Sequence, residues 1–314
     1  MSTRSQDIAA MKKKVIPPFE VTQAMVALEL SKTDEPVLAY FDFFARQIPV
    51  PAAYFLHVLP KFDLFDTVLD QDSQMAVGDY ELNQEVIERM ENKIKERLSK
   101  KNSIYVEFDV KEGDPLEELL KDAEDVGADL LVIGQKTETD YHGIMARNLV
   151  RRTPGNALVI PDQAQPTLRR MLIPIDFSDN SVRALQTAVA INKRLEEPAE
   201  LICLNVYELP NLSVYKASKT PEQFKKMMEA DRENAFRAFI DTYAPEVKDS
   251  VRTELVSRDL PGIGLYIYDF AEEEEVDFIV MGAKGHSKVE LLFIGSVTEK
   301  VLALNDKMPV LIVK

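Results

Sequence analysis

The chain contains one structural pattern twice, and this internal repeat constrains its fold more than any other feature of the sequence. The fourth strand-like segments of the two halves, "ADLLVIG" ending at Gly134 and "VDFIVMG" ending at Gly282, are nearly the same. Each half alternates short apolar segments with amphipathic helical segments, which is typical of parallel strands joined by helical crossovers. At 314 residues the chain has room for two such domains. We therefore predict an α/β fold with two tandem domains, each a five-stranded parallel sheet flanked by helices.

The repeat also predicts where the domains begin and end. Residues 1–22 are polar, lack the apolar segment of a secretory signal and are read as a flexible N-terminal extension. The first domain is predicted at 23–161 and the second at 170–314. Residues 162–169 are read as a linker, because proline and polar residues interrupt any periodicity. The segment "KKKVIPPFE" could be the first strand, but it would insert about nine extra residues, so we prefer a strand at 24–29.

The balance of charged residues excludes several classes of partner. Lys and Arg total 38 against 53 Asp and Glu, so the net charge is −15. A field of this sign repels nucleic acids and anionic lipid surfaces. The apolar runs are shorter than the ~18 residues that a membrane span needs. The single cysteine, Cys203, cannot form an internal disulfide and lies in the apolar run "LICLNV", so we expect it to be buried in a cytoplasmic protein.

Three of the chain's 11 glycines lie within fourteen positions, beginning where the fourth strand of the second half ends. Ligands of open parallel sheets bind beyond the carboxyl ends of the strands. Gly282 and Gly285 would allow positive φ angles and let bare backbone approach a ligand. Gly295 and Ser296 would begin the helix "SVTEKVLAL", whose first amide groups attract anions. Taken singly, each glycine also has a structural explanation, as a strand end, a turn or a helix cap.

These residues fit the pattern G-x2-G-x9-G-S/T, and the segment closely resembles the nucleotide-binding signature of the universal stress protein family. The segments "IPIDFSDNSVRAL" and "IGSVTEKVLALNDKMPVLIVK" fall in that family's order, and the resemblance extends over both halves. It implies two tandem Rossmann-like domains of the adenine nucleotide alpha hydrolase-like type, with ATP and accompanying Mg²⁺ in a domain that keeps the signature. The cofactor-binding residues implied by the resemblance are Asp176, Val206, Met281, Gly282, Gly285, Gly295, Ser296 and Val297.

The resemblance also implies what these residues do. Asp176 would lie beside the nucleoside, Val206 would offer backbone groups to adenine, and Met281 would flank the base. The glycines, with Ser296 and its neighbour, would surround the ribose and the phosphates. No catalytic residue and no metal ligand is expected from the protein. His57 in "FLHVL" is read as a strand histidine with satisfied hydrogen bonds, because no second ligand lies at metal-binding spacing.

The first half departs from the same signature. Gly134 is present, but Thr137 stands where Gly285 would be, and the next glycine, Gly143, is followed by Ile144 instead of a serine. The intervening loop "ETDYH" is short and contains two acidic residues, which would place negative charge near any phosphate. We therefore expect the first half to have lost ATP.

Three classes of function are compatible with this sequence. The leading hypothesis is a universal stress protein that binds ATP in its C-terminal domain and acts as a stress-response regulatory or protective protein. A scaffold or interaction protein that uses neither site is suggested by the degenerate first half and the long charged helices. A slow ATPase is the third class, but we find no P-loop lysine and no general base paired with a nucleophile. We therefore expect a binding protein and not an enzyme.

The last strand of each half, "NALVI" and "PVLIV", would leave an exposed sheet edge if it stayed unpaired. We predict that these two segments meet within one chain, which would give an intramolecular pseudo-dimer like the family's dimers. The sequence leaves a further homodimer open.

Overall fold

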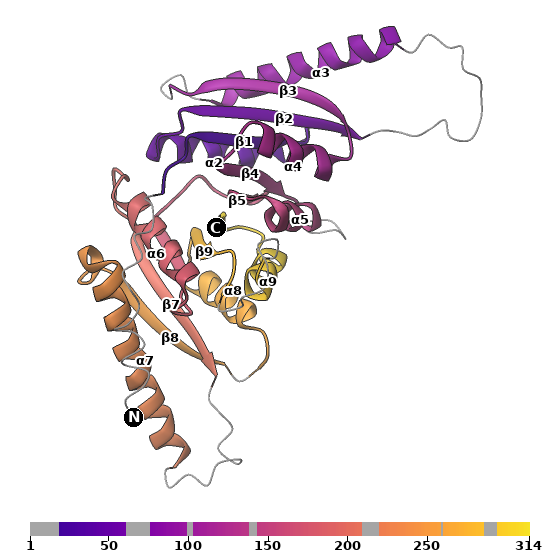
Figure 1. Cartoon of the computed structure of the whole chain (residues 1–314). Helices are drawn as coiled ribbons and strands as arrows, with labels where there is room; N and C mark the ends of the chain where they lie inside the picture. Colours follow the sequence, from indigo (N-terminus) through magenta and orange to yellow (C-terminus); the bar gives the residue numbers. More distant parts are fainter. Residues whose placement is uncertain are drawn as a thin grey trace.

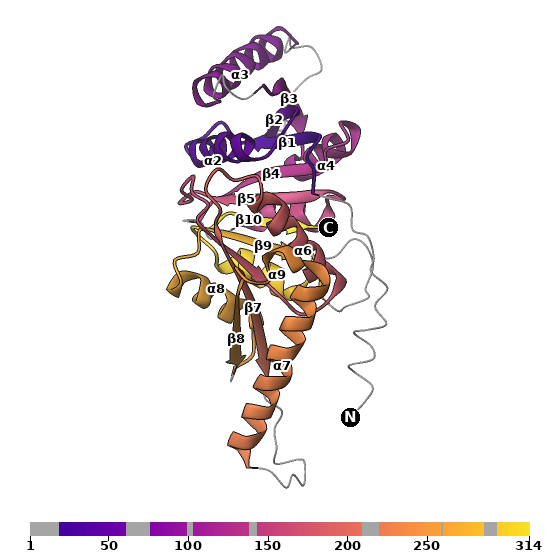
Figure 2. The same ribbon diagram turned by 90° about the vertical axis from the view of Figure 1, so that its left-hand side faces the viewer.

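The strands in the described part of the chain form one continuous sheet. The computed structural model describes residues 19–60, 76–98, 103–137, 143–208, 220–258, 260–285 and 294–314. Ten strands lie in the order β3-β2-β1-β4-β5-β10-β9-β6-β7-β8, which Figure 2 shows as a stack running the length of the molecule. Within each half all neighbours are parallel. The predicted five-stranded parallel sheet is therefore confirmed in both halves.

The elements alternate along the chain as the repeat predicts. Those of the first half are β1 Gln23–Leu28, α2 Asp34–Gln47, β2 Ala52–Pro60, α3 Ala76–Arg97, β3 Tyr105–Gly113, α4 Pro115–Asp125, β4 Leu130–Gln135, α5 Ile144–Arg152 and β5 Asn156–Pro161. Those of the second half are β6 Arg170–Pro174, α6 Asp179–Asn192, β7 Glu200–Glu208, α7 Pro221–Tyr243, the short 3-10 helix Pro245–Val247, β8 Arg252–Arg258, α8 Ile263–Glu273, β9 Phe278–Gly282, α9 Ser296–Leu304 and β10 Val310–Val313. Residues 162–169 form neither helix nor strand.

Helices cover both faces of the sheet, because the strands are apolar on both sides. One face carries α2, α3, α6 and α7, whose buried side chains include Phe41, Met90, Leu185 and Phe236. The opposite face carries α4, α5, α8 and α9, with Leu149 and Val301 among the buried side chains. Figure 1 shows α3 and α7 at opposite ends of the molecule. The result is a three-layer α/β/α arrangement with its core on either side of the sheet.

The two halves join through β5 and β10, which pair in antiparallel fashion with Leu158 opposite Leu311. The predicted meeting of "NALVI" and "PVLIV" is therefore observed. The core is also shared, because the Phe278 ring of β9 stacks on Tyr40 of α2, with 6.2 Å between ring centroids. Both side chains are fully buried. A continuous sheet and a shared aromatic contact indicate that neither half closes its core alone.

The first strand of the repeat lies where we prefer it, because β1 begins at Gln23. Its register equates the two halves: Ala24 pairs with Leu130 of β4 as Met171 pairs with Phe278 of β9. Glu29 therefore occupies the position of Asp176. This correspondence allows the two halves to be compared residue by residue.

The residues before α6 and α8 determine where these helices start. The Ser178 side chain caps α6 by accepting from the amide of Ser181. Helix α8 begins at Ile263, directly after Gly262, which adopts φ 109°.

Two residues of the predicted flexible extension are in fact buried. Phe19 and Val21 pack in the core, and Arg194, just after α6, donates to the Phe19 carbonyl. Burial of these two apolar side chains stabilises this end of the segment against the core. The preceding residues, 1–18, lie outside the described residues. The domain boundaries as such stay a prediction.

The structure agrees with the remaining expectations for single residues. Cys203 is fully buried, and burial raises the pKa of its thiol to about 12. His57 is buried in β2 with Nδ1 2.8 Å from the Leu28 carbonyl, so its reading as a strand histidine is confirmed. None of the helices in the described part of the chain has the length and apolar character that a membrane crossing requires.

Candidate functional site

The predicted site residues gather at the carboxyl ends of β6, β7 and β9, where α6 and α9 begin. Gly282 ends β9 and lies against the start of α6: a Cβ at this position would stand 2.7 Å from the Cβ of Asn180. Neither Gly282 nor Gly285 has a positive φ angle, so that expectation is wrong. Glycine is needed at Gly282 because the helix comes too close for a side chain, and not because of backbone conformation.

The carboxylate of Asp176 is held in a fixed orientation. Its Oδ1 accepts from the amide of Ser178 at 3.0 Å and from the Ser178 hydroxyl at 2.5 Å. Its Oδ2 would lie 2.5 Å from a Cβ placed on Gly285, so only glycine leaves this carboxylate in place. The next residue, Phe177, has φ 64°, which is uncommon for a bulky residue. Its ring packs against Phe236 of α7, with 5.3 Å between the ring centroids, and this packing stabilises the turn that orients Asp176.

The N-cap of α9 is Gly295, which has no side chain of its own to cap the helix. Its amide donates to the Ala283 carbonyl at 2.7 Å. Ser296 follows as the first helical residue and is exposed. A Cβ on Gly295 would lie 3.4 Å from the Ala283 carbonyl oxygen and from Cα of Lys284, which is ordinary contact. The start of α9 therefore presents backbone amides and the Ser296 hydroxyl. A residue larger than glycine at position 295 would reduce the space beside them.

The other predicted residues differ in accessibility. Val206 lies near the end of β7 and is partly buried, as is Val297 in the first turn of α9. Met281 is only 3% exposed and packs in the core under α8 and α9. The structure thus brings Asp176, Gly285 and Gly295 together, whereas the Met281 side chain is an interior residue. His286 and the rest of the loop up to residue 293 lie outside the described residues.

Positive charge lies close to this region. Lys284 is partly buried between Ala283 and Gly285. Burial, and to a lesser degree the like charge of Lys284, lowers the pKa of Lys314 to about 8. An anion near Lys284 would relieve part of this repulsion.

Three further side chains, those of Thr298, Asn205 and Arg232, support the site, and the motif did not indicate them. Thr298 in α9 donates to the Gly282 carbonyl at 3.1 Å, which ties the helix to the end of β9. Asn205 donates to the Ile175 carbonyl at 2.7 Å and accepts from Arg232 of α7 at 2.9 Å. His57 makes the corresponding contact in the first half. The repeat alignment, which places a polar residue at this point of both second strands, was the available signal.

The corresponding region of the first half is occupied by the protein's own side chains. Lys136 forms an ion pair with Glu29 at 2.5 Å, at the positions of Lys284 and Asp176. Thr137, which replaces Gly285, donates its hydroxyl to Asp162 at 2.6 Å. Lys93 of α3 forms a 2.9 Å ion pair with the buried Asp34 at the start of α2.

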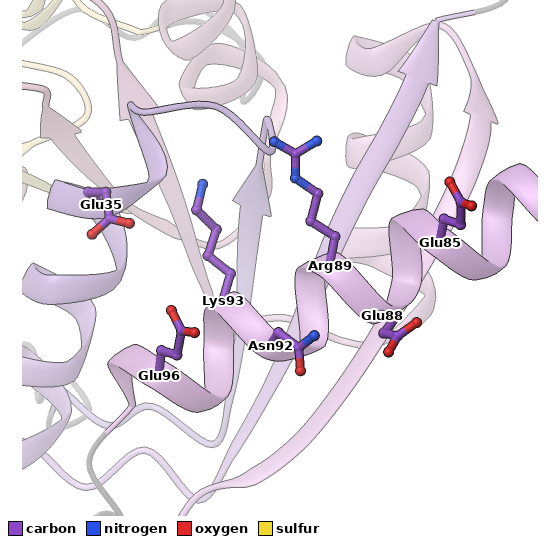
Figure 3. Close-up of a pocket in the computed structure, with 7 residues that line it drawn as sticks. All are labelled: Glu35, Glu85, Glu88, Arg89, Asn92, Lys93 and Glu96. Carbon is purple, nitrogen blue, oxygen red and sulfur yellow. The ribbon is translucent and has the colours of Figure 1, made fainter.

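Lys93 also lines an open groove of about 520 Å³ beside α2 and α3 (Figure 3). Its other lining residues are polar or charged, four of them glutamates. Glu35 of this lining forms an ion pair with Arg97. The groove is therefore a polar surface open to solvent. It lies next to the start of α2, where Lys93 already pairs with Asp34.

Comparison with known proteins agrees with the fold and with the family resemblance of the second half. The family model described as the universal stress protein family matches residues 167–314. A universal stress protein of Methanocaldococcus jannaschii is 30% identical over 147 residues, which is 46% of this chain and 82% of that protein. The universal stress protein YxiE of Bacillus subtilis is 30% identical over 150 residues, which is 46% of this chain and 98% of the Bacillus protein.

The fold is shared along nearly the whole chain. The crystal structure of a universal stress protein from Archaeoglobus fulgidus superimposes with a TM-score of 0.61 at 20% sequence identity, covering 94% of this chain and 99% of that one. From the sequence relatives and the geometry together, the chain belongs to the universal stress protein family.

Proposed function

We propose that this chain binds one ATP, accompanied by Mg²⁺, in its second half. One contrast carries the proposal. In the second half, glycine at Gly285 brings bare backbone close to the oriented Asp176 carboxylate, next to the start of α9 at Gly295 and Ser296. In the first half, the position of Gly285 carries Thr137, whose hydroxyl is bound to Asp162, and the position of Ser296 carries Ile144.

The residues present suit a nucleoside triphosphate. A fixed carboxylate such as Asp176 is a suitable acceptor for hydroxyl or amino groups of a nucleoside. The first amides of α9, the Ser296 hydroxyl and the Lys284 ammonium are suitable donors to phosphate. Within the described ranges, no group of three His, Cys, Asp or Glu side chains could hold a metal, so Mg²⁺ would arrive on the phosphate oxygens.

We further propose that the protein is a stress-response regulatory or protective protein and not an enzyme. The two halves act as an intramolecular pseudo-dimer, in which the first half supports the second. A cytoplasmic location stays a prediction. A scaffold that uses no nucleotide is the alternative, and nucleotide retention distinguishes the two functions.

The experiment is to extract freshly purified protein and identify any retained nucleotide by mass, and then to titrate the stripped protein with ATP and Mg²⁺. Ser296→Ala removes a hydroxyl donor and should weaken binding by about 1.5 to 3 kcal/mol, the range for a hydrogen bond to a charged group. Ile144→Ala is the matched control, because Ile144 is the exposed residue at the same position of the first half. Failure of the wild-type chain to bind any adenine nucleotide would favour the scaffold, and sustained ADP or AMP release would favour an enzyme.

A further inference from the structure

We infer that the first half positions α9, the helix that faces the proposed phosphate site, through Gln135 and Arg151. Both are residues of the first half, and both contact α9 of the second half. They are positioning residues, since neither is expected to touch the ligand. The inference rests on the proposed function and extends it: the half without a nucleotide signature shapes the site of the other half.

Gln135 holds the last turn of α9. Its Nε2 donates to the Leu302 carbonyl at 2.9 Å and to the Asn305 carbonyl at 2.8 Å. The last carbonyls of a helix have no partner within the helix. Gln135 is 2% exposed and Asn305 is fully buried, so water is not available to replace these contacts. The end of α9 is therefore fixed by a side chain from β4.

Arg151 holds the first turn of α9. The guanidinium of Arg151, a residue of α5, lies 2.7 Å from the Glu299 carboxylate. Glu299 is the acidic residue of that first turn, where a helix start attracts negative charge. Without Arg151, the Glu299 carboxylate would be free to compete with a phosphate for the same positive end of the helix. Arg151 therefore both fixes α9 and removes a competing charge.

Each half supports the last turn of the other half's helix, but the arginine contact is one-sided. Counting from Gly143 and Gly295, Ala303 stands in α9 where Arg151 stands in α5, and it carries no charge. The last turn of α5 is bound by Lys314 of the second half, which donates to the Val150 carbonyl at 2.7 Å. Of these two helices, both of which the structure describes in full, α9 alone has a first-turn carboxylate paired with an arginine of the other half. This one-sided contact lies on the helix that begins at the proposed ligand site.

The movement of α9 would reach the ligand directly. The helix has nine residues, and its start is held by Thr298, which binds the end of β9, and by Gly295, which binds Ala283 just after β9. A helix of this length moves as a stiff rod, so release of its far end changes the direction of the first amides. Loss of either contact should therefore alter binding without any change in the residues at the site.

The test compares Arg151→Met and Gln135→Met with a neighbouring control, Arg152→Met. Arg152 is also an arginine of α5, but its two hydrogen bonds go to Glu117, which belongs to the first half. Two quantities are measured: hydrogen exchange of the α9 amides in the ligand-free chain, and the dissociation constant for ATP with Mg²⁺. Arg151 is partly exposed, so its replacement keeps the fold even if Gln135→Met does not.

We expect faster α9 exchange in both test variants and a roughly threefold to tenfold weaker affinity for ATP, in line with ion-pair and helix-end contacts of this kind. Arg152→Met should change neither. Unchanged α9 exchange, or faster exchange with wild-type affinity, would overturn the inference while leaving ATP binding intact. Absence of ATP binding by the wild-type chain would instead overturn the proposed function, and the exchange data would still report whether the first half holds α9.

Discussion

Alanine at two equivalent glycines, Gly143 and Gly295, should have very unequal effects on stability. Both residues precede the last helix of their half. Gly143 has φ 61°, and a Cβ there would lie 2.7 Å from Oε1 of the buried Gln135. Gly295 has φ −68° and ψ 147°, a conformation open to every residue, and its Cβ would make only ordinary contact.

The magnitudes follow from these geometries. For Gly143→Ala, the left-handed backbone costs about 1–2 kcal/mol. Displacement of Gln135 from the Leu302 and Asn305 carbonyls adds about 1–3 kcal/mol for buried groups left without partners. The sum is a loss of about 2–5 kcal/mol in the free energy of unfolding. For Gly295→Ala, a poorer N-cap and a less flexible unfolded chain oppose each other, so the net change should stay within about 1 kcal/mol.

Urea unfolding of the two variants and the wild-type chain, with the slope of each transition compared, measures these differences. The reasoning would be refuted by a Gly143→Ala variant as stable as the wild type, or by a Gly295→Ala variant that loses as much as Gly143→Ala. Gly143→Ala is consequently unsuitable as a neutral control for ligand binding. Ile144→Ala, at an exposed position, serves that purpose.

Three other predictions concern the shared core, pH and turnover. Phe278→Ala should cost about 3–5 kcal/mol and lower the temperature of a single calorimetric transition, because its ring packs against α2 of the other half; two separate transitions would contradict a joint core. Since burial and the charge of Lys284 lower the pKa of Lys314 to about 8, the unfolded chain binds more protons above that pH, and stability should rise with pH from about 8 toward the ordinary lysine range. Urea midpoints across that window should show the rise in the wild type, and an equal rise in Lys314→Met would argue against it. Turnover of ATP should be far below the ~10 per second of an average enzyme, and a site-dependent rate of that size in a phosphate-release assay would indicate catalysis.

The sequence predicts those elements whose signals are local. Helix α7 runs from Pro221 to Tyr243, and its start has a local signal, since Thr220 and Gln223 form a capping box there. Helix α9 starts at Ser296 for the comparable reason that glycine ends the preceding loop. Alternation of strands and helices also predicts the parallel order within each half. These features depend on neighbouring residues, which a single sequence displays.

Features that depend on distant residues were not predictable in the same way. The need for glycine at Gly285 comes from the Asp176 carboxylate, whose orientation is set by Ser178. The contact between Gln135 and Leu302 joins residues 167 positions apart, and no periodicity indicates it. The motif therefore indicates a candidate site, but the contacts of the first half with α9 emerge only from the folded chain.

The most direct test of the asymmetric, single-nucleotide account is the stoichiometry of ATP binding. Titration calorimetry of the stripped chain with ATP and Mg²⁺ should give one site per chain. Gly295→Ala should weaken that site while leaving the fold intact, and Ile144→Ala should bind as the wild type does. Two equivalent sites per chain, or binding that is lost through Ile144→Ala and unaffected by Gly295→Ala, would contradict the account.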